Sequence, residues 1–107
     1  MATYFGQIDT YTVNVLSPNA YSGRRVMNLE GSFGKAILWF HPDDTTLPDN
    51  QKRSGEDVFD IYYNMRDWEA IIDVLRNESP IYFNYSETHK AAQMYTGSEP
   101  VGEEETT

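Results

Sequence analysis

The sequence predicts a small α+β domain, mostly antiparallel β-sheet, with a single α-helix near residues 65–77. Residues 9–16 alternate in character, with Tyr11, Val13 and Val15 on one side, a period typical of a half-buried strand. An apolar stripe with helical spacing begins at Met65 and ends at Leu75. The chain has 107 residues, of which 39% are hydrophobic, enough for one domain with a core of its own.

Five or six strands are predicted around this helix. Their ranges are 9–16, 24–30, 35–40, 58–63 and 81–85, with a further short strand at 91–95. Turn-forming residues at 17–19 and 22–23, and a glycine-flanked loop at 31–34, connect the first three strands. These three strands are therefore expected to form an antiparallel meander.

The helix carries recognisable start and stop signals. Asn64 is the expected N-cap, and Asp67 lies near the positive end of the helix dipole. Pro80 ends the helical pattern, because proline cannot continue a helix and disfavours helical geometry in the residue before it. The apolar stripe consists of Met65, Trp68, Ile71, Ile72 and Leu75.

One helix cannot cover both faces of a sheet of five or six strands. The sheet is expected either to curl, as a small OB-like or SH3-like barrel with the helix plugging one end, or to stay open with the helix on one face. Short strands punctuated by glycine favour curling, and closure removes exposed edges. We therefore expect a small curled sheet or barrel.

The domain is expected to span residues 1–98, with an acidic C-terminal tail at 99–107. Within it, residues 41–57 form a long segment rich in acidic and turn-forming residues, with Leu47 as its only aliphatic side chain. A loop of this length is usually functional, a surface excursion or disordered.

Composition narrows the classes of partner. The net charge of −9 disfavours a nucleic-acid partner, which needs a basic face. The sequence has no apolar run of about 20 residues, so no membrane association is expected. It has no cysteine and no secretory signal pattern, and a cytoplasmic location is expected.

Two groups of residues could carry metal binding or acid–base chemistry. His41, Asp43 and Asp44 could hold a divalent ion, but a strand end followed by an acidic turn explains the same residues more simply. Asp60, between the apolar residues Phe59 and Ile61, is the strongest candidate for acid–base chemistry. A glycosidase-like site needs a larger cleft than this chain supplies. We therefore predict no enzyme activity, no metal and no cofactor.

Aromatic residues are the most informative feature for function. They make up 14% of the chain, and tyrosine is common at interfaces and in ligand walls. Tyrosines coating a strand-rich core would give the same composition. Beside them, three basic residues on the predicted hairpin could form a small cationic patch, or simply its charged outer face. The candidate ligand-binding residues are Arg24, Arg25, Lys35, Tyr62, Tyr82 and Tyr85.

The last third of the chain carries a further pattern. The runs Leu75-Arg76-Asn77-Glu78, Pro80-Ile81-Tyr82 and Glu99-Pro100-Val101-Gly102-Glu103 resemble an LRNE-x-P-x-Y and EPVGE pattern of short bacterial proteins. No activity, ligand or site residue is implied by this resemblance.

These observations lead to three functional hypotheses. The first is a non-enzymatic binding or assembly module that acts through an aromatic-rich surface or a sheet edge and self-associates as a homo-oligomer, or binds another protein. The second is a binder that sequesters a small anionic, nucleotide-like ligand, with tyrosine stacking on the base and Arg24, Arg25 or Lys35 taking the charge. The third is a small hydrolase that uses Asp60 or the segment at His41.

Overall fold

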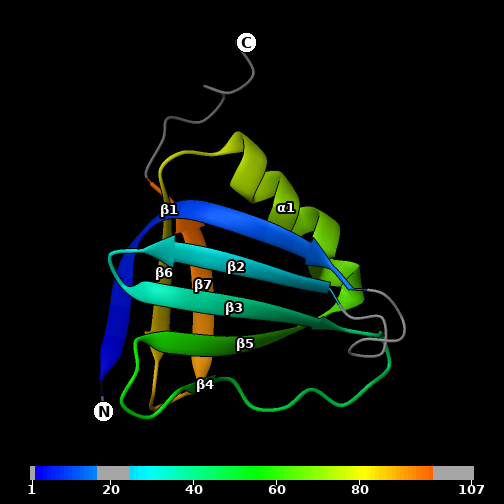
Figure 1. Cartoon of the computed structure of the whole chain (residues 1–107), viewed down its shortest axis with the longest axis horizontal. Coiled ribbons are helices and arrows are strands. Elements are labelled where there is room, and N and C mark those ends of the chain that lie inside the picture. The colour runs from blue at the N-terminus through cyan, green and yellow to red at the C-terminus, as the bar shows by residue number, and fades with distance from the viewer. Residues whose placement is uncertain (1, 17–24, 98–107) are drawn as a thin grey trace.

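A seven-stranded mixed sheet and one helix make up the fold (Figure 1). The structure, a computed structural model, describes residues 2–16 and 25–97. Its elements are β1 (Thr3–Val15), β2 (Arg25–Gly31), β3 (Gly34–His41), β4 (Gln51–Lys52), β5 (Val58–Asn64), a 3₁₀ turn (Met65–Asp67), α1 (Trp68–Asn77), β6 (Ile81–Ser86) and β7 (Ala91–Thr96). The strand order in the sheet is β4-β5-β3-β2-β1-β6-β7.

The α+β class, the curled sheet and the helix are confirmed, but the predicted strand number is too low. The sheet has seven strands rather than five or six, because β4 pairs two residues within the expected loop. All neighbouring strands are antiparallel except β3 and β5, which are parallel. The sheet forms a half-barrel rather than a closed barrel, since β4 and β7 lie at opposite ends of the strand order.

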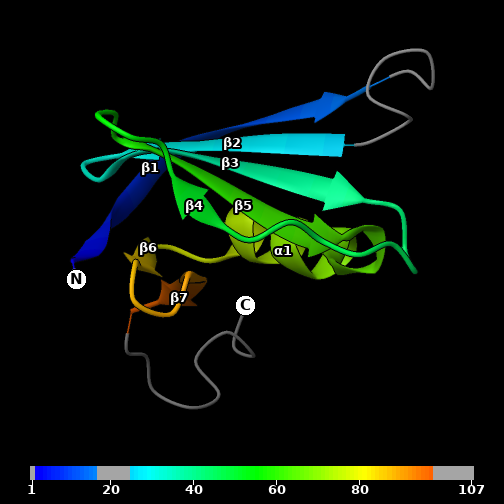
Figure 2. The same ribbon diagram turned by 90° about the horizontal axis from the view of Figure 1, so that it is seen from below.

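Strand β1 makes the sheet curl, because its two halves pair with different neighbours. Its first half pairs with β6 from Thr3 to Gln7, and its second half pairs with β2 up to Val15, with a bulge between Ile8 and Thr10. Such bulges bend a strand and increase its twist. Figure 2 shows the result: β6 and β7 lie beneath the layer formed by β2, β3 and β5.

Glycine permits the close backbone approach at this bend. A Cβ atom added to Gly31 would overlap the backbone oxygen of Gln7, and one added to Gly6 would lie 2.8 Å from the backbone nitrogen of Phe33. Any other residue at these positions would force the two halves of the sheet apart.

The core fills the concave side of the half-barrel, between the strands and α1. The helix contributes Trp68, Ile71 and Leu75, as its apolar spacing predicts. Phe59 lies at the centre of an aromatic cluster, with ring centroids 5.4 Å from Phe83 and 5.5 Å from Tyr85. The side chains that are almost fully buried are Tyr85, Phe40, Phe59, Phe83, Met27, Leu29, Leu38 and Ile61.

The helix is capped differently from the prediction. Asn64 has extended backbone geometry but makes no side-chain hydrogen bond to the turn that follows. Instead, the backbone N–H of Arg66 donates to Oδ1 of Asp43, 3.0 Å away, from the loop after β3. Within residues 2–16 and 25–97, no helix is long and apolar enough to cross a membrane.

The long segment after β3, for which a functional loop, a surface excursion and disorder were all left open, is tied to the sheet at several points. Asn50 joins β5, β6 and the β6–β7 turn: its Oδ1 accepts from the backbone N–H of Tyr62, its Nδ2 donates to the Lys90 carbonyl, and its own carbonyl accepts from the Tyr85 hydroxyl. After β4, the Arg53 N–H donates to the Val58 carbonyl at 2.8 Å. This segment therefore helps to hold β5 and the β6–β7 turn together. The expected tail at 99–107 lies outside the described residues.

Candidate binding site

The face of β2, β3, β5 and the second half of β1 that points away from α1 carries the candidate site. We call it the open face, because no described helix or strand covers it, and it faces the viewer in Figure 1. Strand register places two rows of side chains across it. One row is Asn14, Val26, Trp39 and Tyr62, and the other is Thr12, Asn28, Ile37 and Asp60.

A hollow of about 270 Å³ lies on the open face. Its apolar part includes Val26 and Ile37, which are only 6% and 9% exposed although they lie on the uncovered side of the sheet. Trp39 lines it as a partly exposed aromatic ring. The hollow is lined by Asn14, Leu16, Val26, Asn28, Ile37, Trp39 and Arg53. It thus combines an apolar floor with amide and guanidinium groups that can form hydrogen bonds.

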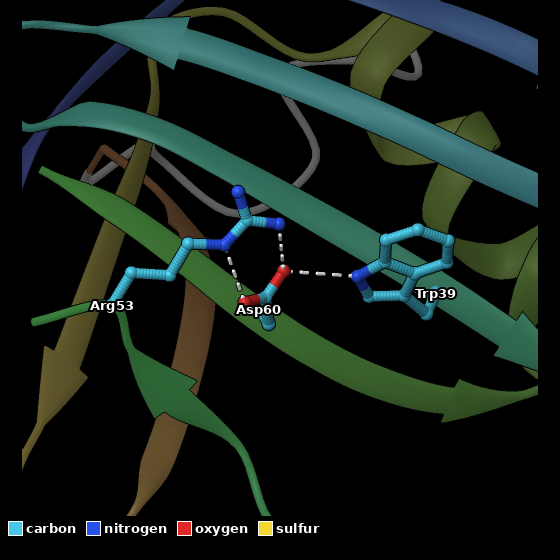
Figure 3. A network of polar contacts seen from close by, with 3 residues as sticks. All are labelled: Trp39, Arg53 and Asp60. Atoms are coloured by element: carbon cyan, nitrogen blue, oxygen red, sulfur yellow. Dashed lines mark hydrogen bonds and ion pairs between the residues drawn. The ribbon is translucent and has the colours of Figure 1, made fainter. Parts of the chain in front are cut away.

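A network of three polar side chains lies beside the hollow (Figure 3). The Arg53 guanidinium binds Asp60 through two bonds, from Nε to Oδ2 at 2.9 Å and from Nη2 to Oδ1 at 3.0 Å. The indole Nε1–H of Trp39 donates to the same Oδ1 at 3.1 Å. Two parallel bonds of this kind between arginine and carboxylate fix geometry as well as charge.

The network determines the ionisation of Asp60, which is only 4% exposed. Burial alone would raise the pKa of Asp60, but hydrogen bonds from Arg53 and Trp39 and the positive charge of Arg53 outweigh it, so the pKa is lowered. Asp60 is therefore a carboxylate at neutral pH, with both oxygens occupied. It has no proton to give and is poorly placed to accept one, which disfavours the acid–base role considered for it.

The same bonds fix the orientation of Trp39. Its ring cannot rotate without breaking the bond to Asp60, which Arg53 holds in turn. In Figure 3 the remaining guanidinium nitrogen of Arg53 points away from Asp60. A ring and a donor group held in this way lose little conformational freedom when a ligand binds, which is the advantage of a preorganised site.

Two of the six predicted ligand-binding residues lie on the open face. Lys35 is at the start of β3, paired with Glu30 on β2 and with Val58 on β5. Tyr62 is next to Trp39 in the register, and its ring meets that of His41 edge-on at 5.5 Å.

The other predicted residues lie elsewhere. Arg25 places its guanidinium carbon 5.2 Å from the ring centre of Trp68, at the helix. Tyr82 stacks on Tyr95 across β6 and β7, with centroids 5.4 Å apart. Tyr85 is 2% exposed and belongs to the core. Arg24 lies outside the described residues, and the other five do not form one surface.

The metal hypothesis for the segment after β3 finds no supporting geometry. The His41 ring is buried against Tyr62, whereas Asp43 accepts the Arg66 N–H at the start of the helix. In the described part of the chain, no three histidine or acidic residues converge in a way that could hold a metal ion.

None of the residues that line the hollow was among the predicted ligand-binding residues, and the most important of those missed are Trp39 and Arg53. Trp39 lies in an almost wholly apolar strand, so its outward-facing position was not apparent. Arg53 lies in an acidic segment, seven residues before Asp60. Asp60 itself lies in a strand whose residues on either side of it are apolar. A buried aspartate in such a strand requires a cationic or N–H partner, and this requirement was the available signal.

Comparisons with protein-family models, curated proteins and solved structures find no match for this chain. The proposals below therefore rest on the residues and geometry of the chain itself.

Proposed function

We propose that this protein is a non-enzymatic binding module that recognises another protein through its open face. A partner side chain that is apolar or aromatic would enter the hollow and pack against Trp39, Val26 and Ile37. The observation that carries this proposal is the fixed orientation of Trp39 beside an apolar hollow on an uncovered sheet face.

The size of the hollow favours a single side chain over a whole small molecule. Sites that bury most of a drug-sized ligand have volumes of about 300–1,000 Å³. The hollow here is about 270 Å³ and lies at the surface of a sheet. It can hold one ring or branched side chain, as the central pocket of a protein interface does, while the rest of the partner lies across the strands.

Residue types and charge support the same proposal. Tryptophan, tyrosine and arginine are the residues that most often dominate binding energy at interfaces, and Trp39, Tyr62 and Arg53 lie together on this face. The chain carries a net charge of −9, so a partner with a basic surface around its anchoring side chain would be attracted at long range.

A nucleotide-like anion is the second candidate ligand, but the hollow offers it little positive charge. The charge of Arg53 is already paired with Asp60, so no unbalanced positive charge remains there. Arg25 and Lys35, the described basic residues expected to take the charge, are not part of the hollow lining.

Side-chain analogues can test the proposal without knowledge of the partner. ¹⁵N-labelled protein is titrated with N-acetyl-phenylalanine amide, N-acetyl-leucine amide and AMP, and followed by the Trp39 Nε1–H and Asn28 side-chain amide signals. We expect the two amides, but not AMP, to shift both signals at millimolar concentration. Asn14→Trp, which places a bulky ring at the rim of the hollow, should abolish the shifts. Gln93→Trp, at an exposed position on β7, is the matched control and should leave them unchanged.

The outcomes separate the two candidates. Shifts with AMP alone would favour the nucleotide-like ligand over a protein side chain. If no compound moves the Trp39 signal, or if Gln93→Trp removes the shifts as completely as Asn14→Trp, the open face is not the binding site.

A further inference from the structure

The two edges of the sheet are unequal. The edge at β4 is two residues long, includes Lys52 and is followed directly by Arg53. A very short strand and positive charge are both features by which proteins protect an edge from pairing with another chain. The edge at β7 is six residues long and its sequence, Ala91-Ala92-Gln93-Met94-Tyr95-Thr96, contains no charge and no proline.

Hydrogen-bond alternation shows which backbone groups face outward from β7. The N–H of Gly97 donates to the carbonyl of Pro80, so Gly97 points toward β6. In an antiparallel ladder every second residue bonds to the same neighbour. Tyr95, Gln93 and Ala91 therefore point toward β6 as well. The intervening residues Ala92, Met94 and Thr96 turn their N–H and C=O groups to the other side, where no described strand pairs with them.

We infer that two copies of this chain associate through antiparallel pairing of their β7 strands about a twofold axis at Met94. In this register Met94 faces Met94 of the second copy, and Ala92 faces Thr96 in both directions. Each of the three outward residues supplies one donor and one acceptor, so all three are satisfied at once. A shift of the register by two residues would leave at least one of them unpaired.

The side chains on both surfaces of β7 suit this arrangement. Ala92 and Met94 pack partly against the core of their own copy, and pairing would bring the two Met94 side chains together over the joined sheets. On the other surface, Gln93 of one copy would lie opposite Tyr95 of the second, beside the Tyr82–Tyr95 stack. A twofold axis makes such an interface self-complementary, as most homodimers require.

β7 can accept a second copy of itself because its residues carry no charge. The chain has a net charge of −9, so two copies repel one another where acidic surfaces meet, but pairing along β7 brings no like charges together.

Sedimentation of the full chain tests this inference, over about 1–100 µM, since dimerisation is concentration-dependent. We expect a reversible monomer–dimer equilibrium. Thr96→Pro removes one outward N–H without touching the ladder to β6, and should raise the dimer dissociation constant at least tenfold. Thr96→Val keeps that N–H and should dimerise like the original chain. Circular dichroism checks that both variants are folded.

Amide hydrogen exchange gives a second test that requires no substitution. The N–H groups of Ala92, Met94 and Thr96 should exchange more slowly as the protein concentration rises. Those of Gln93 and Tyr95, which face β6, should be protected at every concentration. A monomer throughout the range, equal dimerisation of Thr96→Pro and Thr96→Val, or protection at Met94 independent of concentration would each overturn the inference. Asn14→Trp, on the open face, should leave the dimer intact, so this result is separable from the proposed function.

Discussion

Removing either partner of the Arg53–Asp60 pair should destabilise the fold, but by unequal amounts. Arg53→Met keeps an apolar stem over Asp60 and removes the guanidinium. It leaves a carboxylate that is 4% exposed and that keeps hydrogen bonds only from Trp39, shown in Figure 3, and from Gln51. Asp60→Asn removes the negative charge but leaves an arginine whose side chain is 40% exposed and can be hydrated.

The magnitudes follow from this difference in exposure. Breaking a buried pair so that one charge stays buried costs about 3–5 kcal/mol, and we expect about 3 kcal/mol for Arg53→Met because water reaches the arginine end. Asp60→Asn retains an oxygen that can accept from Trp39 or Arg53. It should cost about 1 kcal/mol, the net contribution of a typical hydrogen bond.

The loss of stability in Arg53→Met should depend on pH. In the original chain the lowered pKa of Asp60 contributes stability above the unfolded-state pKa, about 3.9, and this contribution is lost as pH falls through the folded-state pKa. In Arg53→Met, only the hydrogen bonds from Trp39 and Gln51 still oppose the effect of burial, so the pKa of Asp60 rises above its value in the original chain. The variant should then become more stable, relative to the original chain, as the carboxyl is protonated.

Urea denaturation at neutral pH and near pH 4 measures both effects, and urea avoids the screening that guanidinium would add. The loss for Arg53→Met should be largest at neutral pH and smaller near pH 4. An equal or larger loss for Asp60→Asn, or a loss for Arg53→Met that does not change with pH, would refute this account of the network.

Three further substitutions test the fold. Trp68→Ala should lower the free energy of unfolding by about 3–5 kcal/mol, measured in urea, since Trp68 is 6% exposed in the core; a loss below about 1 kcal/mol would mean that the helix face is wrong. Asn50→Ala should lower the free energy of unfolding by about 1–3 kcal/mol in the same assay, because the Asn50 side chain no longer accepts from the Tyr62 N–H. Asp49→Ala, at an exposed ion pair, is the control and should lower it by less than about 1 kcal/mol. Gly31→Ala should prevent stable folding, because its Cβ would overlap the Gln7 carbonyl, and the cooperative thermal transition should be lost. As the control, Gly55→Ala meets no atom within 4 Å and should retain that transition, with only the strain of a positive φ.

Local patterns predicted the elements well. The three- and four-residue spacing of Trp68, Ile71 and Leu75 placed the helix and its buried side, because a stripe of that period has only one way to face a core. The predicted meander of the first three strands is confirmed, since β2 pairs antiparallel with both β1 and β3.

Features fixed by distant parts of the chain were missed. β4 is too short to leave a periodic signal, and it exists because Gln51 and Lys52 can pair along β5. The helix cap at Asp43 comes from another loop, whereas the local sequence indicates only the nearby Asn64. The parallel pairing of β3 with β5 depends on the route of a long connection that propensity does not determine.

The candidate site could be predicted only in part. An aspartate between apolar strand residues is unusual, and this identifies Asp60 from the sequence. Its role depends on Arg53 and on the side of the sheet that Trp39 faces, which the sequence does not show. A one-residue change of register would move Trp39 into the core, and the sequence of an apolar strand does not distinguish the two registers. Tyr85 illustrates the same limit, since it was proposed for a ligand and lies in the core.

The divided pairing of β1 has a consequence for how the chain is completed during synthesis. The second half of β1 can pair as soon as β2 has been made, but its first half must wait for β6; Tyr4 and Glu87, which share a hydrogen bond, are 83 residues apart. Until β6 emerges from the ribosome, residues 3–7 remain an unsatisfied strand next to an uncovered Phe59. β6 therefore completes the pairing of β1, and a stalled or truncated product that lacks β6 would expose both the unpaired residues 3–7 and the Phe59 side chain to other nascent chains.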